Sequence, residues 1–156
     1  MSGNPDDPRL ERTRAALAEA LHQLLARMPF EDITVQKILD RAGVGRSTFY
    51  AHYSDKGDLL LSDADRFFAA IAARPVRELF VHVSEAPRLY DALRGNDDVR
   101  ALGRAHFAAR LGDGPVGEAL AAALFALLDY WIRTGMREPP EQMEAMFGGL
   151  SGTLRP

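Results

Sequence analysis

Apolar residues recur every three to four positions along most of the chain, which is the repeat of an amphipathic α-helix. Pro and Gly interrupt this pattern and divide it into segments. No stretch of convincing length alternates apolar and polar residues, and the β-branched stretch 79–83 has neighbours that favour helix. The sequence therefore predicts an all-α fold.

Turn and capping residues locate the expected helices. Pro29 ends the first helix because it lacks an amide proton, and Thr34 supplies a side-chain oxygen that caps the second. Gly43 can adopt the left-handed backbone conformation that closes this second helix, and Asp55 can cap a fourth. The expected helices cover about residues 9–28, 35–42, 46–53, 56–71, 76–84, 87–94, 97–111, 115–134 and 139–150.

Composition narrows the class of protein. Hydrophobic residues make up 47% of the 156 and charged residues 26%, which is typical of a soluble globular protein and not of a disordered one. The chain has no cysteine, which excludes disulfides, thiolate nucleophiles and cysteine-rich zinc sites. Residues 1–8 lack the features of a secretory signal, so we expect a disordered tail there. No apolar run reaches the roughly 18 residues that cross a bilayer, and we expect a cytoplasmic protein outside the membrane.

Charge is divided unevenly along the chain, whose net charge is −3. Residues 9–57 carry eight Lys and Arg against six Asp and Glu, a net charge of +2. Residues 58–156 carry eleven against fourteen, a net charge of −3. This asymmetry favours a small domain facing nucleic acid over residues 9–57, followed by a helical body over residues 58–156.

Residues 34–53 contain two short helical segments joined at a glycine, which is the pattern of a helix-turn-helix. In this motif the second helix enters the major groove of DNA, about 12 Å wide, and presents side chains to base edges. Phe49 and Tyr53 are four residues apart and therefore point the same way, into the core. At about 100° per residue, Ser47 and Ala51 lie opposite Phe49, so their side of the helix should face outward.

Side chains on this outward side suit contacts with DNA. Arg46 has the guanidinium fork that matches O6 and N7 of guanine, and Ala51 is small enough to meet a thymine methyl group. The hydroxyl groups beside them can contact bases or phosphates, and the flanking phenol and imidazole can reach phosphates. Lys56 combines a point charge with the positive end of a helix, which suits a phosphate. The candidate DNA contacts are Thr34, Arg46, Ser47, Thr48, Tyr50, Ala51, His52 and Lys56.

The same region carries a longer pattern, formed by Thr34, Ile38, Ala42-Gly43-Val44, Ser47-Thr48-Phe49-Tyr50, His52-Tyr53, Lys56 and Asp58-Leu59. Over about residues 10–60 it resembles the N-terminal signature of the TetR family of bacterial transcriptional regulators. The resemblance implies that the first three helices bind a roughly palindromic operator and that the body forms a homodimer. It also implies a small effector that releases a repressor from DNA. Two features depart from the family: Gly45 stands where a capping Ser is common, and the body is shorter than usual.

The body offers a candidate effector pocket. Aromatic and aliphatic residues recur there at helical spacings, together with a histidine and an arginine that can orient a ligand. With the resemblance, they favour a pocket for a small apolar or aromatic effector, although core packing explains most of them equally well. The candidate ligand-binding residues are Phe67, Phe68, Leu89, Tyr90, Leu93, His106, Phe107 and Arg110.

The body also offers a candidate dimer interface. Residues 115–134 form a helix about 30 Å long, whose apolar face is broader than one neighbour needs. Together with the helix over residues 139–150, two copies can build a four-helix interface, as the resemblance implies. The alternative is that both helices simply close the core of a single chain.

Other functions find little support in the sequence. The four histidines lack metal-ligand spacing, so no metal site is expected. No nucleophile, base and orienting group can be identified together, and no glycine-rich loop follows a strand, so neither an enzyme nor a cofactor is expected. The remaining alternative is a small-molecule binding or sequestering protein of the same fold without specific DNA binding.

Overall fold

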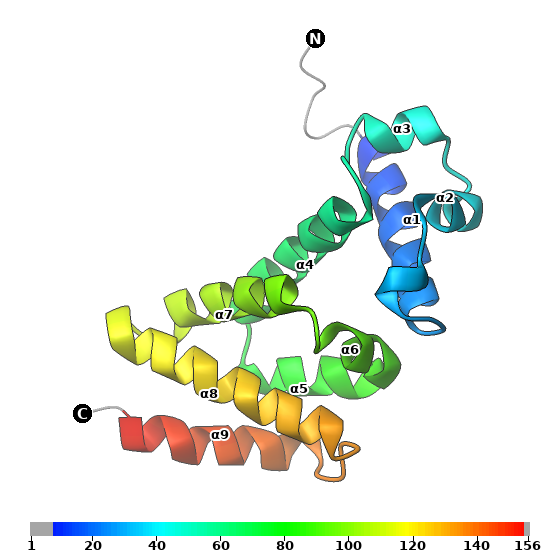
Figure 1. The fold of residues 1–156 in the computed structure, drawn as a ribbon. Helices are drawn as coiled ribbons and strands as arrows, with labels where there is room; N and C mark the ends of the chain where they lie inside the picture. The colour runs from blue at the N-terminus through cyan, green and yellow to red at the C-terminus, as the bar shows by residue number, and fades with distance from the viewer. Residues whose placement is uncertain (1–7, 155–156) are drawn as a thin grey trace. The chain divides into compact units, whose positions relative to one another are not determined.

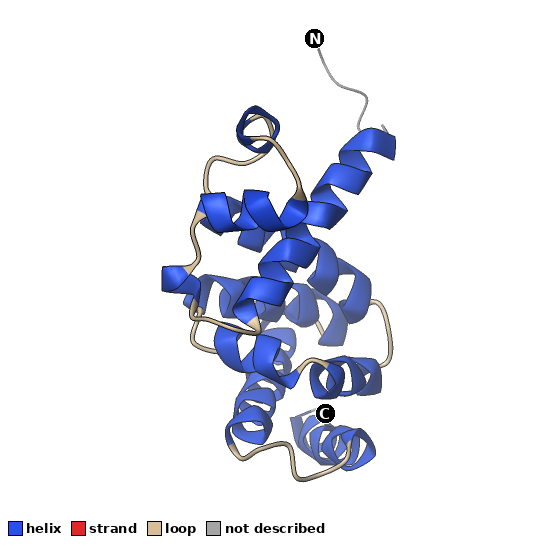
Figure 2. Ribbon diagram, turned by 90° about the vertical axis from the view of Figure 1, so that its right-hand side faces the viewer, coloured by secondary structure: helices blue, strands red, loops and turns tan. Residues whose placement is uncertain are grey.

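The computed structural model describes residues 8–154, and every regular element among them is helical (Figures 1 and 2). The expected all-α class is therefore confirmed. The chain divides into two compact units, residues 1–63 and residues 64–156, which are joined within helix α4 (Lys56–Ala72). The tail expected over residues 1–8 lies outside the described part of the chain except for Pro8, which is the first residue of helix α1.

Unit 1, residues 1–63, packs its helices around one apolar core. Its elements are α1 (Pro8–Leu25), the 3₁₀ helix η1 (Phe30–Asp32), α2 (Val35–Ala42), α3 (Arg46–Tyr50) and the first part of α4. Each α-helix contributes fully buried side chains to this core, among them Leu17, Leu21, Ile38, Phe49 and Leu59. The helical repeat of the sequence therefore becomes the inner face of each element.

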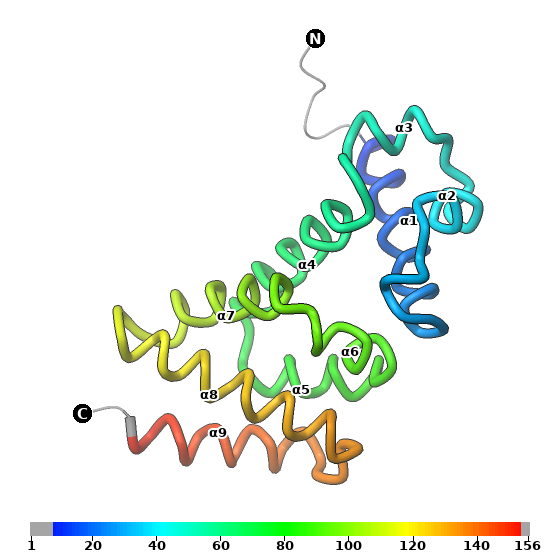
Figure 3. The backbone as a smooth tube through the Cα atoms, viewed as in Figure 1, coloured from blue at the N-terminus to red at the C-terminus, as the bar shows by residue number. Residues whose placement is uncertain are grey.

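Side-chain caps and one glycine fix the short helices of unit 1. The hydroxyl of Thr34 accepts a hydrogen bond from the amide of Lys37 at 3.2 Å and caps α2. Gly43 follows α2 with φ of 65°, the left-handed conformation. The chain turns here between α2 and α3, as Figure 3 shows for the two helices. The carboxylate of Asp55 accepts a hydrogen bond from the amide of Asp58 at 2.9 Å and caps α4. These expectations from the sequence are confirmed.

Two helices of unit 1 end earlier than the sequence predicts. α1 ends at Leu25 rather than at residue 28, and α3 ends at Tyr50 rather than at residue 53. In both places the chain tightens into a turn in which an amide bonds to the carbonyl three residues back, as His52 does to Phe49 at 2.9 Å. Because this tight turn continues the course of the helix, Ser47 and Ala51 still face outward as the sequence predicts.

Unit 2, residues 64–156, is a second packed set of helices. After the end of α4 it contains α5 (Val76–Glu85), α6 (Pro87–Leu93), α7 (Asp97–Leu111), α8 (Gly114–Arg133) and α9 (Pro140–Leu154). α7 packs along α8, and α9 packs against both α5 and α8 (Figure 1). The bounds agree with the predicted ranges to within one residue, except that α9 runs to residue 154 rather than 150.

Two glycines allow close packing around α7. A Cβ atom at Gly117 would lie 2.5 Å from the carbonyl oxygen of Ala108 and would also overlap the carbonyl of Gly112. A Cβ atom at Gly103 would lie 2.7 Å from the ring of Phe68. Both distances are shorter than real Cβ contacts, so a side chain at either position would force its neighbours to move. Gly117 lets the start of α8 lie directly against the end of α7.

α8 is the central helix of unit 2. By length and composition alone it could cross a membrane, since an 18-residue window has a mean hydropathy of 1.4. Its inner face is nevertheless buried in the protein, including Leu120, Leu124 and Trp131. Trp131 packs edge-on against Phe80 with 5.6 Å between ring centroids, and its indole nitrogen donates to the carbonyl of Glu138 at 2.9 Å. Packing within unit 2 therefore explains the apolar residues on the inner face of this helix.

Candidate nucleic-acid interface

α3 is held on unit 1 by two aromatic side chains. Phe49 is fully buried, Tyr53 is 6% exposed, and their ring centroids lie 5.6 Å apart. They join a core to which α2 contributes Ile38 and Leu39. Because one side of α3 is anchored in this way, its opposite side faces solvent.

The solvent-facing side of α3 and the residues that follow it carry most of the candidate DNA contacts. Tyr50 is 51% exposed although it is a large aromatic residue, and its ring stands edge-on to Phe49 at 5.2 Å. Such exposure contributes little to packing and leaves the ring available to a partner. The exposed candidates in this segment are Arg46, Ser47, Thr48, Tyr50, Ala51 and His52. The structure therefore brings these sequence-based candidates together on one short segment.

A chain of hydrogen bonds links α3 to α2 at the same surface. The guanidinium Nη2 of Arg46 donates to Oε1 of Gln36 at 2.9 Å, and Nε2 of Gln36 donates to Oδ1 of Asp40 at 2.7 Å. All three side chains are exposed. Neither Gln36 nor Asp40 was among the sequence-based candidates. Their spacing of four residues on α2 was the available signal, because residues i and i+4 meet on one helix face.

Thr34 and Lys56 lie at the starts of α2 and α4, respectively. Thr34 is exposed at the N-terminus of α2, where the helix dipole favours an anion. The ammonium group of Lys56 instead turns toward the loop after α1 and donates to the carbonyls of Phe30 at 2.7 Å, Glu31 at 3.1 Å and Ile33 at 2.7 Å. Since an ammonium group has three donors, Lys56 has none left for the phosphate expected from the sequence.

α4 carries two carboxylates that bind histidines of other helices. Within unit 1, Oδ2 of Asp63 lies 2.6 Å from Nε2 of His22 in α1. Within unit 2, Oδ1 of Asp65 lies 2.7 Å from Nε2 of His106 in α7. The hydrogen bond that the imidazole of His22 donates to Asp63, helped by the charges of Asp63 and Glu19, raises the pKa of His22 above its ordinary value, although burial acts in the opposite direction.

Part of the expected ligand-binding set forms an aromatic cluster in unit 2. The ring of Phe67 stacks on His82 at 4.8 Å between centroids, and Tyr90 lies 6.3 Å from Phe67 and 5.9 Å from His82. Leu89 and Leu93 lie on α6, the helix that carries Tyr90, and are half-buried. His82 was not among the sequence-based candidates, because its helical neighbours gave no sign that it would meet Phe67.

The other expected ligand-binding residues lie in the core or at the surface. Phe68 and Phe107 are 6% and 1% exposed, and each packs against Phe125 at 6.0 Å between centroids. His106 is occupied by its bond to the carboxylate of α4, and Arg110 is exposed at the end of α7. Core packing accounts for both phenylalanines without a ligand.

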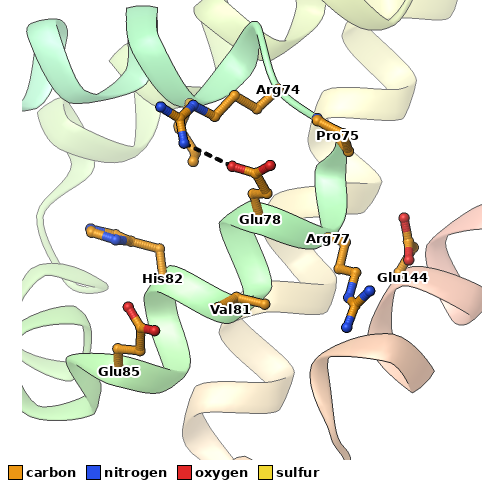
Figure 4. Close-up of a pocket in the computed structure, with 9 residues that line it drawn as sticks. Arg74, Pro75, Arg77, Glu78, Val81, His82, Glu85 and Glu144 are labelled. Atoms are coloured by element: carbon orange, nitrogen blue, oxygen red, sulfur yellow. Dashed lines mark hydrogen bonds and ion pairs between the residues drawn. The ribbon is translucent and has the colours of Figure 1, made fainter.

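A separate hollow of about 590 Å³ opens on α5, beside the end of α4 and one side of α9 (Figure 4). Charged side chains dominate its rim, and Arg74 binds Glu78 across it at 2.9 Å. Among the described residues that line it, none belongs to the eight expected for a ligand, although His82 of the aromatic cluster does. The hollow is thus lined by other residues than those that the sequence indicated, and it borders them through His82, which stacks on Phe67.

The solvent side of unit 2 carries apolar residues on α8 and α9. Val116 and Tyr130 of α8 are 36% and 47% exposed, and Met146 and Leu150 of α9 are 39% and 44% exposed. These two helices pack against each other (Figure 1). The apolar surface falls within both segments expected to form a dimer interface.

Comparison with known proteins first identifies the helix-turn-helix region. Residues 17–62 match the sequence model of the family described as bacterial regulatory proteins, tetR family. Two relatives come from Bacillus subtilis (strain 168). The uncharacterized HTH-type transcriptional regulator YdeS is 32% identical over 93 residues, which cover 56% of this chain and 47% of YdeS. The uncharacterized HTH-type transcriptional regulator YxbF is 38% identical over 66 residues, which cover 42% of this chain and 17% of YxbF. The chain thus spans less than half the length of either curated relative.

Solved structures share the fold over nearly the whole chain. The dihydroxyacetone kinase operon activator DhaS aligns with a TM-score of 0.73 and 18% identity, over 90% of this chain and 94% of that chain. A TetR transcriptional regulator from Streptococcus agalactiae 2603V aligns with a TM-score of 0.65 and 21% identity, over 92% and 95%. The TetR family repressor AlkX from Dietzia sp. strain DQ12-45-1b has a TM-score of 0.56 and 14% identity, over 97% of each chain. The family match and the two related regulators show that residues 17–62 resemble the helix-turn-helix segment of the tetR family of bacterial regulatory proteins, and the solved structures share the fold of nearly the whole chain.

Proposed function

We propose that this chain regulates transcription by binding operator DNA in a sequence-specific manner. The observation that carries the proposal is the arrangement of α3: Phe49 and Tyr53 anchor one side in the core, and the other side exposes polar groups and Tyr50. A helix held in this way can enter the major groove, which admits one α-helix. The net charge of +2 over residues 9–57 supports the same surface.

The exposed side chains of α3 suggest how the contacts divide. Arg46 reads guanine through O6 and N7, and Ala51 contacts a thymine methyl group. The hydroxyls of Ser47 and Thr48 contact bases or phosphates, and the remaining candidates, Thr34, Tyr50 and His52, bind phosphates. Lys56 is left out because its ammonium group is held by backbone carbonyls.

We propose further that two copies assemble through α8 and α9. An apolar stripe runs along the solvent side of α8 at helical spacing, formed by the exposed Val116, Ala119, Ala126 and Tyr130 and the half-buried Ala123 and Leu127. It continues on α9 at Met146 and Leu150. A second copy can cover this surface by a self-complementary contact. Two recognition helices about 34 Å apart then fit successive major grooves of a roughly palindromic operator.

The output we propose is repression relieved by a small effector. A dimer that covers two major grooves blocks access to the promoter, and a ligand that favours a different spacing of the recognition helices releases it. The cluster of Phe67, His82 and Tyr90 supports an apolar or aromatic effector. A cytoplasmic location follows from the proposed access to DNA.

The experiment that tests DNA binding is retention of fragmented genomic DNA on the purified protein, followed by sequencing. Enrichment of a palindrome supports the proposal. The double variant Arg46→Ala/Tyr50→Ala should lower the affinity for the enriched site at least about tenfold, since one base-reading arginine contributes roughly 1–3 kcal/mol.

A charge-matched control is Arg104→Ala, because Arg104 is exposed on α7 in unit 2. This variant should retain the same DNA fragments as the parent. If the parent enriches no sequence, or if the double variant retains the same fragments equally well, the alternative gains support. That alternative is a small-molecule binding or sequestering protein of the same fold.

A further inference from the structure

We propose that Gln36 of α2 is a specificity-determining residue that holds the guanidinium group of Arg46 in place to read a base, and that Asp40 positions Gln36. The inference rests on the proposed function, because it assigns a role within the same DNA-binding surface. It is carried by the two hydrogen bonds Arg46 to Gln36, 2.9 Å, and Gln36 to Asp40, 2.7 Å.

Chemistry fixes the direction of this hydrogen-bond chain. A guanidinium group only donates hydrogen bonds and an ionised carboxylate only accepts them, whereas a glutamine amide does both at opposite ends. The carbonyl oxygen of Gln36 must therefore face Arg46, and its NH₂ group must face Asp40, as the observed atoms do. Asp40 thus selects the one orientation of the amide that can accept from Arg46.

This hydrogen-bond chain, Arg46 to Gln36 to Asp40, forms a relay that is compatible with base reading by Arg46. A guanidinium group has five N–H donors, of which Gln36 takes one from Nη2. Nη1 and Nη2 therefore each keep at least one N–H group that can donate to O6 and N7 of guanine. Gln36 can therefore stay bound while the base is read.

The position of Arg46 makes such support useful. It is the first residue of α3, and Gly45 before it offers no side-chain cap, so the bond to Gln36 ties this end of α3 to α2. A long side chain that is already ordered loses less conformational entropy when it binds. When Gln36 holds the guanidinium group in one orientation, Arg46 binds best to the base whose acceptors match that orientation. The bond to Gln36 should therefore change the discrimination between bases more than the general affinity for DNA.

The chain contains a second relay of the same chemistry that serves as a control. Nε of Arg41 donates to Oε1 of Gln23 at 2.5 Å, and Nε2 of Gln23 donates to Oε1 of Glu19 at 2.7 Å. This relay joins α1 to α2 and includes no residue of α3. Gln23→Ala therefore removes an equivalent set of surface hydrogen bonds without touching Arg46.

The first measurement is a selection from a randomised DNA duplex library with the full chain, its variant Arg46→Ala and the relay variants. The base pair whose preference disappears in Arg46→Ala is the one read by that side chain. Gln36→Ala should lower the preference at this pair by roughly two- to tenfold, the size expected for a single hydrogen bond. The other positions and the salt dependence should not change, because phosphate contacts are untouched.

Variants of Asp40 test the positioning step. Asp40→Ala should weaken the same preference, and Asp40→Asn should keep it, because an asparagine carbonyl still accepts from the NH₂ group of Gln36. Gln23→Ala should leave the preference of the parent unchanged. A loss of affinity that is equal for all sequences in Gln36→Ala would mean a purely structural role and would overturn the inference.

A second measurement does not depend on DNA. In the free protein, ¹⁵N relaxation of the Arg46 Nε–H group should report an ordered side chain that becomes mobile in Gln36→Ala. If mobility rises but the base preference stays the same, the inference fails while the proposed function stands. If the parent selects no sequence at all, the proposed function fails and the inference falls with it.

Discussion

At the residue scale, the ammonium group of Lys56 donates to three backbone carbonyls of the segment between α1 and α2. Its three hydrogen bonds fasten the segment around η1 to the first residue of α4, and the ammonium group also lies 4.5 Å from the centroid of the Phe30 ring. Hydrogen bonds from a charged donor are stronger than neutral ones. Lys56, which the sequence suggested as a phosphate ligand, therefore stabilises the segment that leads into the helix-turn-helix.

Lys56→Met should lower the free energy of unfolding by about 1–2 kcal/mol, because three carbonyls lose a charged donor while the side-chain volume is kept. Urea denaturation measures this loss. Lys37→Met is the matched control, since Lys37 donates to a single carbonyl, that of Asp32 at 2.9 Å. Equal losses in the two variants would contradict the proposed role of Lys56.

Two glycines two positions apart should respond oppositely to serine. Gly45 is the N-cap of α3 with φ of −73° and ψ of 150°, and a Cβ atom there meets nothing closer than 3.9 Å, so Gly45→Ser adds a cap. We expect a gain of about 0.5 kcal/mol in the free energy of unfolding. Gly43→Ser should cost about 1 kcal/mol, because its φ of 65° strains any residue with a Cβ atom. Urea midpoints of the two variants on the same side of the parent would refute this reasoning.

At the element scale, α4 is fastened to α1 by the bond between Asp63 and His22. This bond raises the pKa of His22 above its ordinary value of 6.5, so the folded state holds the proton more tightly than the unfolded state. The stabilising contribution is fully present below the unfolded pKa and is lost as pH rises through the folded pKa. Both side chains are partly exposed, at 36% and 25%, so the contribution should be less than about 1 kcal/mol.

His22→Gln should therefore destabilise the protein more at about pH 6 than at about pH 9, since only the protonated imidazole carries the charge that pairs with Asp63. The measurement is a series of urea denaturations across this range. Asp63→Asn should remove the same pH-dependent component, and the double variant should remove no more than either single variant. A difference between parent and His22→Gln that does not vary with pH would show that the ion pair contributes nothing.

Most helices of both units were predictable from sequence because Pro, Gly and capping residues such as Thr34 act locally. The outward side of α3 was predictable because Phe49 and Tyr53 are buried and fix the rotation of the helix about its axis. Contacts between elements were not. The bond of Gln36 to Arg46 depends on how α2 and α3 cross, and the ammonium group of Lys56 reaches a loop 23 to 26 residues away in the sequence. Helical periodicity carries no information about either.

At the scale of the whole molecule, the exposed apolar residues of α8 and α9 form the proposed dimer interface. Leu150→Glu should convert the proposed dimer to a monomer of 17.2 kDa, because a carboxylate in an apolar interface would have to be desolvated. Light scattering at micromolar concentration measures the mass. Ala105→Glu places the same charge on an exposed position of α7 and should leave the dimer intact. A parent chain that scatters as a monomer would exclude this interface.

The division of α3 into a buried and an exposed side has an evolutionary consequence. The side chains that face solvent at Ser47, Thr48 and Ala51 take almost no part in the core that holds the helix. Substitutions at these positions should cost little stability, since surface changes usually alter it by less than about 0.5 kcal/mol. Descendants of this gene can therefore drift toward new target sites one exposed residue at a time, while Phe49 and Tyr53 keep the scaffold unchanged.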